Sequence, residues 1–420
     1  MVLTAAFVVL VFFYSLVSQR LQSTVITAPM LFTAAGAATT LLPEAARELV
    51  LDRKVLLLIA ELGLVMLLFT DASRINRSLL KAGRSLPIRL LCVGMPLTVV
   101  SGAVTAVVVL SGLSWGEAGI LAAILAPTDA GLGHVIVTSE RVPLTIRQSL
   151  SVEAGLNDGL AVPLLMLFIV LAVAEESRPA GAVLARFLGE QLGYGTLIGI
   201  GIGALGGWLL GLAHRTRWMA TPLGELGVVA LPLLCVIAAE ETGASMLIAA
   251  FVAGFAVQFG FDAAGQQGVE FTEKWGQLFN YFVFFFFGAV VAGSWGHFTP
   301  AVLLYAVLSL TVVRMAPVAL ALNGTRLSHA TVLFMGWFGP RGLASIVLAL
   351  MYLVQETALP GTSTIRLAVI ATVLLSIFAH GLTAQPGIGL YARRIAALDE
   401  TSPERQALGY GSPEPPHVGT

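Results

Sequence analysis

Residues 115–139 read WGEAGILAAILAPTDAGLGHVIVTS, an apolar segment interrupted near its middle by Ala126-Pro127-Thr128-Asp129. Proline lacks a backbone N–H and clashes with the preceding helical turn, so a helix that contains Pro127 breaks or kinks there. The break frees backbone carbonyls and exposes helix ends that need new partners. The segment therefore predicts two half-helices joined by a non-helical stretch.

A second apolar segment, residues 329–354, is interrupted in the same way at Gly339-Pro340-Arg341-Gly342. The two breaks lie seven predicted spans apart, so spans 1–6 and 8–13 are expected to form an inverted repeat with one broken helix in each half. Paired broken helices at matching positions are the best sequence pointer to a transport site near mid-membrane. The alternative is a kinked helix that is merely packed, but two matched breaks beside charged residues favour a functional site.

Composition places the chain in a membrane. Its 420 residues are 57% hydrophobic and 11% charged, with a mean hydropathy of +0.89, whereas a soluble domain carries about a quarter charged residues. A membrane-crossing helix needs about 20 apolar residues, and this window predicts an all-α polytopic membrane protein with about 13 transmembrane helices. The expected spans are approximately 1–17, 24–42, 54–71, 87–112, 115–139, 147–174, 183–213, 221–239, 243–260, 276–293, 300–322, 329–354 and 364–390.

The distribution of positive charge predicts the orientation. If the spans alternate, fifteen of the 23 basic residues fall on one side and six on the other, so the first side is expected to be cytoplasmic. The N-terminus is then outside and the C-terminus inside a cell (inner) membrane. No basic residue precedes Arg20, so the first span is expected to be retained rather than cleaved as a signal. The polar tail, residues 396–420, is expected to be disordered and cytoplasmic.

Charged residues inside the spans mark the candidate site. Asp158 lies on the order of 16 Å into span 6, near the middle of a ~30 Å hydrocarbon core. A charge at that depth costs at least about 2.5–3.5 kcal/mol on insertion scales, so it has to be paired, hydrated or functional. Arg341 is similarly deep, stays protonated and needs an anion. Glu153 is the nearest candidate in depth, so we predict a structural ion pair between Glu153 and Arg341.

That pairing leaves Asp158 without an obvious cationic partner. Burial disfavours the charged form of a carboxylate, so a proton and a metal ion can compete for it. The neighbouring Asn157 adds an amide oxygen but no charge. One carboxylate holds either one proton or one monovalent cation, so exchange is expected to be one to one and to move no net charge. The alternative is a protonated aspartate bonded to a neighbouring helix.

Three further polar residues accompany the break in span 5 and the end of span 3. Thr128 and Asp129 are preferred helix N-caps, and they can equally supply oxygen ligands, which hard cations prefer. The two roles are compatible, and the residues alone leave both open. Asp71 ends span 3 at the predicted cytoplasmic mouth; it is read as a solvated helix end, with attraction of cations as the alternative.

These motifs resemble the electroneutral monovalent cation:proton antiporters, the bacterial NhaP-type relatives of the Na+/H+ exchangers. The resemblance rests on Pro127-Thr128-Asp129, on Glu153 with Asn157-Asp158, and on the motif that begins Gly339-Pro340-Arg341-Gly342, and it covers the chain to about Arg394. It implies a homodimer, with dimer-interface helices at about 1–71 and 221–293 and core helices at about 87–174 and 300–390. The exchanger domain then covers 1–395 and includes a linker helix at 183–213.

The same resemblance implies that the two broken helices cross in the core and that Asp158 holds the cation or the proton. Thr128 (through its backbone), Asp129 and Ser151 match further cation positions, and Glu153 with Arg341 matches the ion pair of the family. The chain departs from the common pattern at Asp129-Ala130-Gly131, which bears on ion selectivity. Movement of the core against the dimer helices is implied as well.

We therefore expect a secondary antiporter that exchanges Na+ for H+, with Li+ or K+ as the alternative cation. A channel would need a continuous pore, and a membrane sensor would not need a mid-membrane carboxylate. Nucleophile–base pairs and metal-protease motifs are not found in the spans, so an enzyme is not expected. No cofactor, nucleotide or nucleic-acid partner is expected either. The sequence assigns no role to Arg314 or His380.

Overall fold

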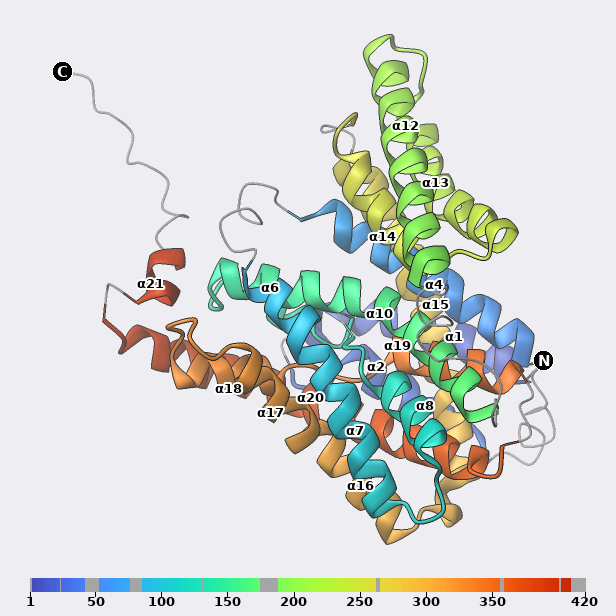
Figure 1. The fold of residues 1–420 in the computed structure, drawn as a ribbon. Coiled ribbons are helices and arrows are strands. Elements are labelled where there is room, and N and C mark those ends of the chain that lie inside the picture. The colour runs from blue at the N-terminus through green and yellow to red at the C-terminus, as the bar shows by residue number, and fades with distance from the viewer. Residues whose placement is uncertain are drawn as a thin grey trace.

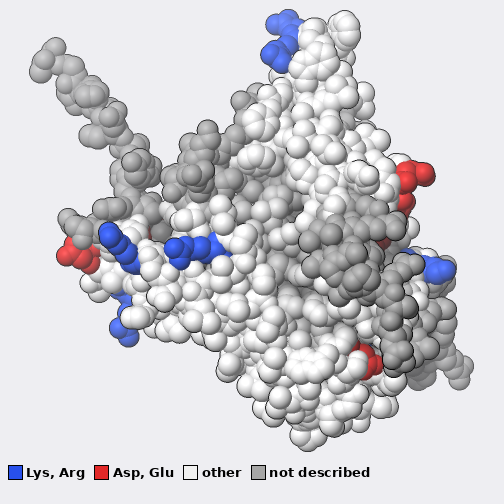
Figure 2. All heavy atoms as spheres, in the orientation of Figure 1, with Lys and Arg blue, Asp and Glu red and all other residues white. Residues whose placement is uncertain are grey.

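The computed structural model describes residues 2–22, 24–41, 53–75, 85–129, 131–173, 188–261, 265–355, 359–399 and 402–408. This part of the chain is helical and contains no strand, as predicted. Nine of its helices are long and apolar enough to cross a membrane, and three shorter apolar helices accompany them. Figure 2 shows a face on which charged side chains are few and separated by broad uncharged areas, as contact with lipid requires. The count of thirteen spans and the inverted repeat remain predictions.

The helices follow one another in the order of the predicted spans (Figure 1). Their bounds are α1 Val2–Gln22, α2 Ala28–Thr39, α4 Arg53–Ser73, α6 Ser85–Arg89, η1 Leu90–Gly94, α7 Met95–Val109, α8 Trp115–Leu125, α9 His134–Thr138, α10 Leu144–Val173, η2 Leu188–Tyr194, α12 Gly195–Arg215, α13 Thr221–Thr242, α14 Met246–Val257, α15 Gly265–Ser294, η3 Trp295–His297, α16 Pro300–Leu310, α17 Val312–Ala321, α18 His329–Trp337, α19 Leu343–Val354, α20 Thr362–Ala396 and α21 Pro403–Leu408.

Both predicted breaks are present. Helix α8 starts at a capping box in which Ser114 and Glu117 satisfy each other's backbone N–H groups, and it ends before Pro127; the helical path resumes only at α9. Helix α18 starts at the N-cap Ser328 and ends at Trp337, before Pro340, and α19 begins at Leu343. The prediction of two broken helices is confirmed.

The helices pack in two groups. In one group α4 packs against α14 and α15, and α15 also packs against α2. In the other, α7, α8, α10, α16 and α20 form the close pairs. Glycines permit the closest approaches, because a side chain there would collide with the backbone of the facing helix. On α12 these glycines recur every four residues against α14 and the turn that follows it: Gly199, Gly203, Gly207 and Gly211.

The predicted disordered tail needs a correction. Helix α20 continues to Ala396, and residues 403–408 form the short helix α21, which packs against α10 and α20. Glu404 of α21 is buried and accepts hydrogen bonds from the backbone N–H of Ser328 (2.7 Å) and the hydroxyl of Thr331 (2.8 Å). It thereby binds the start of α18, which the composition of the tail did not indicate. Residues 409–420 lie outside the described residues.

Candidate functional site

The two breaks meet. The backbone N–H of Asp129 donates to the carbonyl of Pro340 (2.8 Å), so the non-helical stretch after α8 is hydrogen-bonded directly to the one between α18 and α19. Backbone groups released by a broken helix need partners inside a membrane. Here each break supplies a hydrogen-bonding partner for the other. The predicted crossing of the broken helices therefore places four half-helix ends around one point.

The Asp129 carboxylate binds backbone N–H groups from both sides of this crossing. Its Oδ1 accepts from the N–H groups of Gly131 (2.7 Å) and Leu132 (3.2 Å), and its Oδ2 accepts from Leu343 (2.5 Å), the first residue of α19. A carboxylate is stabilised at helix N-termini because both the free N–H groups and the helix dipole favour it. Gly342 allows this approach, since a Cβ there would collide with the Asp129 carboxylate. The capping role considered for Thr128 and Asp129 is not found at α9, whose N-cap is Gly133; Asp129 instead binds the turn before α9 and the first N–H of α19.

Arg341 binds the C-terminal end of helix α8. Its Nη1 donates to the carbonyls of Ala126 (2.7 Å) and Pro127 (2.8 Å), where α8 ends, and its backbone N–H donates to Ser376 Oγ (2.6 Å). The side chain is fully buried. A cation at a helix C-terminus is favoured by the free carbonyls and by the dipole. The buried charge of Arg341 is thus stabilised largely by backbone dipoles.

The predicted pairing of Glu153 with Arg341 is wrong. Glu153 Oε1 accepts from Arg314 Nη1 at 2.6 Å, and both side chains are 2% exposed. Arg314 lies on α17, just after the irregular backbone at Thr311 that separates α16 from α17. Depth within the membrane could not distinguish two arginines, and the sequence reasoning ignored carbonyls as partners for Arg341. The structure shows that Gly339 leaves room for Arg314, because a Cβ at Gly339 would collide with the Arg314 guanidinium.

Asp158 differs from these paired groups. It is 3% exposed, and its Oδ1 is buried with no hydrogen-bond partner among the described residues. Its neighbour Asn157 donates through Nδ2 to Thr128 Oγ1 (2.8 Å) and accepts through Oδ1 from the Thr128 N–H (3.3 Å). Asn157 therefore fastens the first break to α10, while the adjacent carboxylate stays available.

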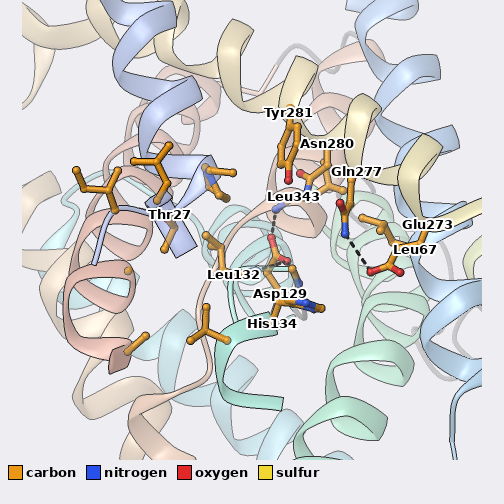
Figure 3. Close-up of a pocket in the computed structure, with 18 of the residues that line it drawn as sticks. Thr27, Leu67, Asp129, Leu132, His134, Glu273, Gln277, Asn280, Tyr281 and Leu343 are labelled. Atoms are coloured by element: carbon orange, nitrogen blue, oxygen red, sulfur yellow. Dashed lines mark hydrogen bonds between the residues drawn. The ribbon is translucent and has the colours of Figure 1, made fainter. Parts of the chain in front are cut away.

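A cavity of about 240 Å³ leads to Asp158 and Asp129. Its wall carries two more acids, Asp71 of α4 and Glu273 of α15, together with His134 of α9. Figure 3 shows Asp129 and His134 on one side and the side chains of α15 on the other. Asp71 thus lines the route to the site rather than only ending a helix. We call this space the access cavity.

The sequence reasoning missed the wall of the access cavity formed by α15. Glu273, Gln277 and Asn280 were not singled out, although their spacing of four and three residues puts them on one helix face. Ser151 is half-buried, lies seven residues before Asp158 on α10, and is not among the described residues that line the access cavity. Its assignment as a cation ligand stays a prediction.

His380 supports the second break. Its Nε2 lies 2.9 Å from the carbonyl of Trp337, the last residue of α18, and its Nδ1 lies 3.0 Å from Ser376 Oγ, which accepts from Arg341 N–H. With the proton on Nε2, one chain of hydrogen bonds runs from Arg341 N–H through Ser376 and His380 to the Trp337 carbonyl. Helix α20 thereby holds both ends of the non-helical stretch 338–342.

Comparison with known proteins identifies the family. A family described as sodium/hydrogen exchanger, transmembrane, matches residues 4–388. The chain belongs to this family. Among sodium/hydrogen exchanger relatives, it is 28% identical over 255 residues to a Na(+)/H(+) antiporter of Schizosaccharomyces pombe, over 55% of this chain and 53% of that protein. It is 26% identical over 301 residues to the K(+)/H(+) antiporter NhaP of Alkalimonas amylolytica, over 71% and 51% respectively.

The chain spans about half the length of these two curated relatives. Its fold is similar to that of the sodium proton antiporter MjNhaP1 from Methanocaldococcus jannaschii at pH 8, with a TM-score of 0.73 and 20% identity. That match covers 94% of this chain and 98% of the other. The predicted membrane-antiporter fold is confirmed, and the relatives are transporters rather than enzymes.

Proposed function

We propose that this sodium/hydrogen exchanger homologue exchanges one monovalent cation for one proton across a membrane, with Asp158 binding the two in turn. The observation that carries the proposal is the state of this carboxylate: it lines the access cavity, is almost fully buried, and has an Oδ1 without a hydrogen-bond partner among the described residues. A buried carboxylate without a partner is stabilised by binding either a proton or a cation. The antiport named for the two relatives agrees with this chemistry.

Asp158 supplies the charge of the proposed site, and its neighbours supply further oxygens. Thr128 offers its carbonyl and hydroxyl beside the break, and Asn157 orients it through two hydrogen bonds. Asp129 is already bound by three backbone N–H groups, so its negative charge acts on the cation more than its lone pairs do. Oxygen ligands of this kind suit a hard alkali cation.

Na+ is the cation we propose, and K+ is the alternative that one observation favours. The two relatives are named as Na(+)/H(+) and K(+)/H(+) antiporters, respectively. Li+ is the third ion to test, because its charge density is the highest of the three. A single titrating carboxylate gives a one-to-one exchange that moves no net charge.

We further propose that α7–α10 and α16–α20 form a core that moves against α1–α4 and α13–α15, which would also form a homodimer interface. Among these helices the closest pairs lie within one group or the other, with α19 against α4 and α10 against α14 as the main contacts between them, and this supports the division. The charge distribution of the sequence supports a cell (inner) membrane with the N-terminus outside. The access cavity then opens to the cytoplasm, because Asp71 and Glu273 lie at the predicted cytoplasmic ends of α4 and α15.

Reconstituted protein tests the proposal. Proteoliposomes loaded with a pH-sensitive dye and given an acid interior should lose their proton gradient when Na+, Li+ or K+ is added outside. Asp158→Asn protein, inserted in equal amount and with an unchanged melting temperature in detergent, should not respond. Normal exchange by this variant would reject the assignment of the site.

Stoichiometry is tested separately from the site. Clamping the membrane potential with valinomycin and K+ should leave the Na+/H+ rate unchanged, whereas a channel would produce a current. Asn157→Asp adds a second carboxylate and keeps an acceptor for the Thr128 N–H, so it should retain exchange and become sensitive to potential. A voltage-dependent rate in the unaltered protein would contradict one-to-one exchange.

A further inference from the structure

Helix α15 presents a polar face to the access cavity. Glu273, Gln277 and Asn280 lie on this face at steps of four and three residues, and all three line the access cavity. The rest of α15 packs against α2 and α4. In Figure 3 this face lies across the access cavity from Asp129. Helix α15 therefore belongs to a different packing group from α8 and α10, which carry Asp129 and Asp158.

The two outer members of this face are bound to other side chains. Glu273 Oε2 pairs with Arg74 (2.6 Å), and Glu273 Oε1 accepts from Gln277 Nε2 (3.0 Å). These contacts fix the mouth of the access cavity. They occupy both carboxylate oxygens of Glu273, and Gln277 is bound through its amide nitrogen.

Asn280, the innermost member, is different. It is 4% exposed, and its Oδ1 is buried with no hydrogen-bond partner within the described part of the chain. Its Nδ2 lies close to Gly131: a Cβ built there would be 3.3 Å from Asn280 Nδ2 and 3.0 Å from Asp129 Oδ1. The side chain of Asn280 on α15 and the Asp129 carboxylate thus both lie beside Gly131, and Asn280 turns its amide nitrogen toward that residue. A buried amide oxygen normally has a partner, so this one marks a place where a ligand belongs.

We propose that Asn280 is a specificity-determining residue that contacts the transported cation through its Oδ1. An amide oxygen is a neutral, hard ligand of the kind alkali and alkaline-earth cations accept. The inference rests on the proposed function and adds to it a ligand from the opposite wall. Because α15 packs apart from α8 and α10, this ligand is offered only while the two walls face each other as they do here.

The rival explanation is that water alone satisfies the Asn280 oxygen, since buried polar groups in roomy cavities often bind water. The two explanations differ in ion dependence. A direct ligand interacts differently with Li+, Na+ and K+, because the three ions differ in radius. A water-bound amide would affect all three alike.

The test compares variants in the same proteoliposome assay and measures the half-saturating concentration of each ion. Asn280→Ala should raise the value for the preferred ion about tenfold, the effect of losing about 1.4 kcal/mol of binding, and should change the three ions unequally. Asn280→Asp, which is nearly isosteric, should lower it and slow turnover because the ion is held more tightly. Thr272→Ala is the matched control: Thr272 is buried on the same helix, is not among the described residues that line the access cavity, and donates its hydroxyl to Gly268 O in its own helix.

Folding is checked by melting temperature in detergent, and the Asp variant keeps the test decisive if the Ala variant does not fold. An unchanged half-saturating concentration in both variants, or an equal shift for all three ions, would overturn the role of Asn280. If the unaltered protein exchanges and Asp158→Asn does not, such a result refutes this inference alone. If the unaltered protein exchanges no cation, the proposed function itself fails.

Discussion

Asp129 and Asp158 line the same cavity and are both almost fully buried, yet their surroundings are opposite. Three backbone N–H groups, two from the turn before α9 and one from the start of α19, bind Asp129, whereas Asp158 Oδ1 has no partner in the described residues. The first carboxylate is used to hold broken helices together, and the second is left free to bind something else. Depth in the membrane and residue type therefore do not by themselves assign a role to a buried aspartate. Its hydrogen-bond partners do.

The largest effect is expected when the charge of Asp158 is removed, which tests whether Asp158 differs from Asp129 in function. Asp158→Asn should reduce cation/proton exchange to the level of protein-free liposomes while leaving the melting temperature in detergent unchanged or higher. The physical reason is that the amide removes a buried charge that has no donor. Dye-based flux and a thermal melt on the same sample measure both effects. A large drop in melting temperature would mean that Asp158, like Asp129, is structural.

The next largest effect is expected at the buried ion pair. Arg314→Ala leaves Glu153 buried without its partner and should destabilise the protein by about 3–5 kcal/mol. Arg341→Ala removes two hydrogen bonds to carbonyls and should cost about 1.5–3 kcal/mol. Unfolding in detergent measures both values.

A double-mutant cycle separates the two arginines. Glu153→Gln should couple strongly to Arg314→Ala and weakly to Arg341→Ala, since contacting residues are not additive. Stronger coupling of Glu153 to Arg341 would restore the pairing predicted from the sequence.

Asp129→Asn should cause a smaller loss of stability and, unlike Asp158→Asn, should only weaken cation/proton exchange. The amide keeps one acceptor oxygen but points an NH2 group at a backbone donor, so we expect a loss of about 1–3 kcal/mol. Exchange should weaken without being abolished, because Asp158 remains. If the variant keeps full stability and loses all exchange, Asp129 is the binding carboxylate and the comparison is reversed.

Glu404 extends the comparison to a carboxylate outside the membrane spans. Burial raises its pKa, but hydrogen bonds from Ser328 N–H and the Thr331 hydroxyl lower it more, so the pKa of Glu404 lies below its ordinary value. A lowered folded-state pKa gives stability that is present above the unfolded value and lost as pH falls through the folded value. Docking of α21 should therefore hold at neutral pH and weaken only in acid.

Glu404→Gln should lower the free energy with which α21 docks at neutral pH by about 1 kcal/mol or less. This is the smallest effect considered. Faster proteolysis or faster amide hydrogen exchange of residues 402–408 would measure it, and the rate of cation/proton antiport should stay unchanged. Equal protection of the variant and the unaltered protein would contradict the contact.

The sequence was sufficient for the broken helices and for the burial of Asp158, because proline and a carboxylate within an apolar span carry strong local signals. Thr128 and Asp129 were located at the first break for the same reason, whereas the contact of Asn157 with Thr128 was not predicted. Partner choice was not predictable: Arg341 binds carbonyls that any sequence possesses, so nothing in the residue pattern announced them. Asn280 was missed because its role depends on which helix faces the crossing, and that is decided by packing between segments distant in the chain.

The hydrogen bond between Asp129 N–H and the Pro340 carbonyl joins main chain to main chain, so no substitution of Asp129 other than proline removes its donor. Asp129 adds a second tie through Leu343, and Arg341 a third through Ala126. With three such ties, sliding one interrupted helix past the other would break them all at once. The two interruptions should therefore travel as one rigid piece, carrying any bound ion with them.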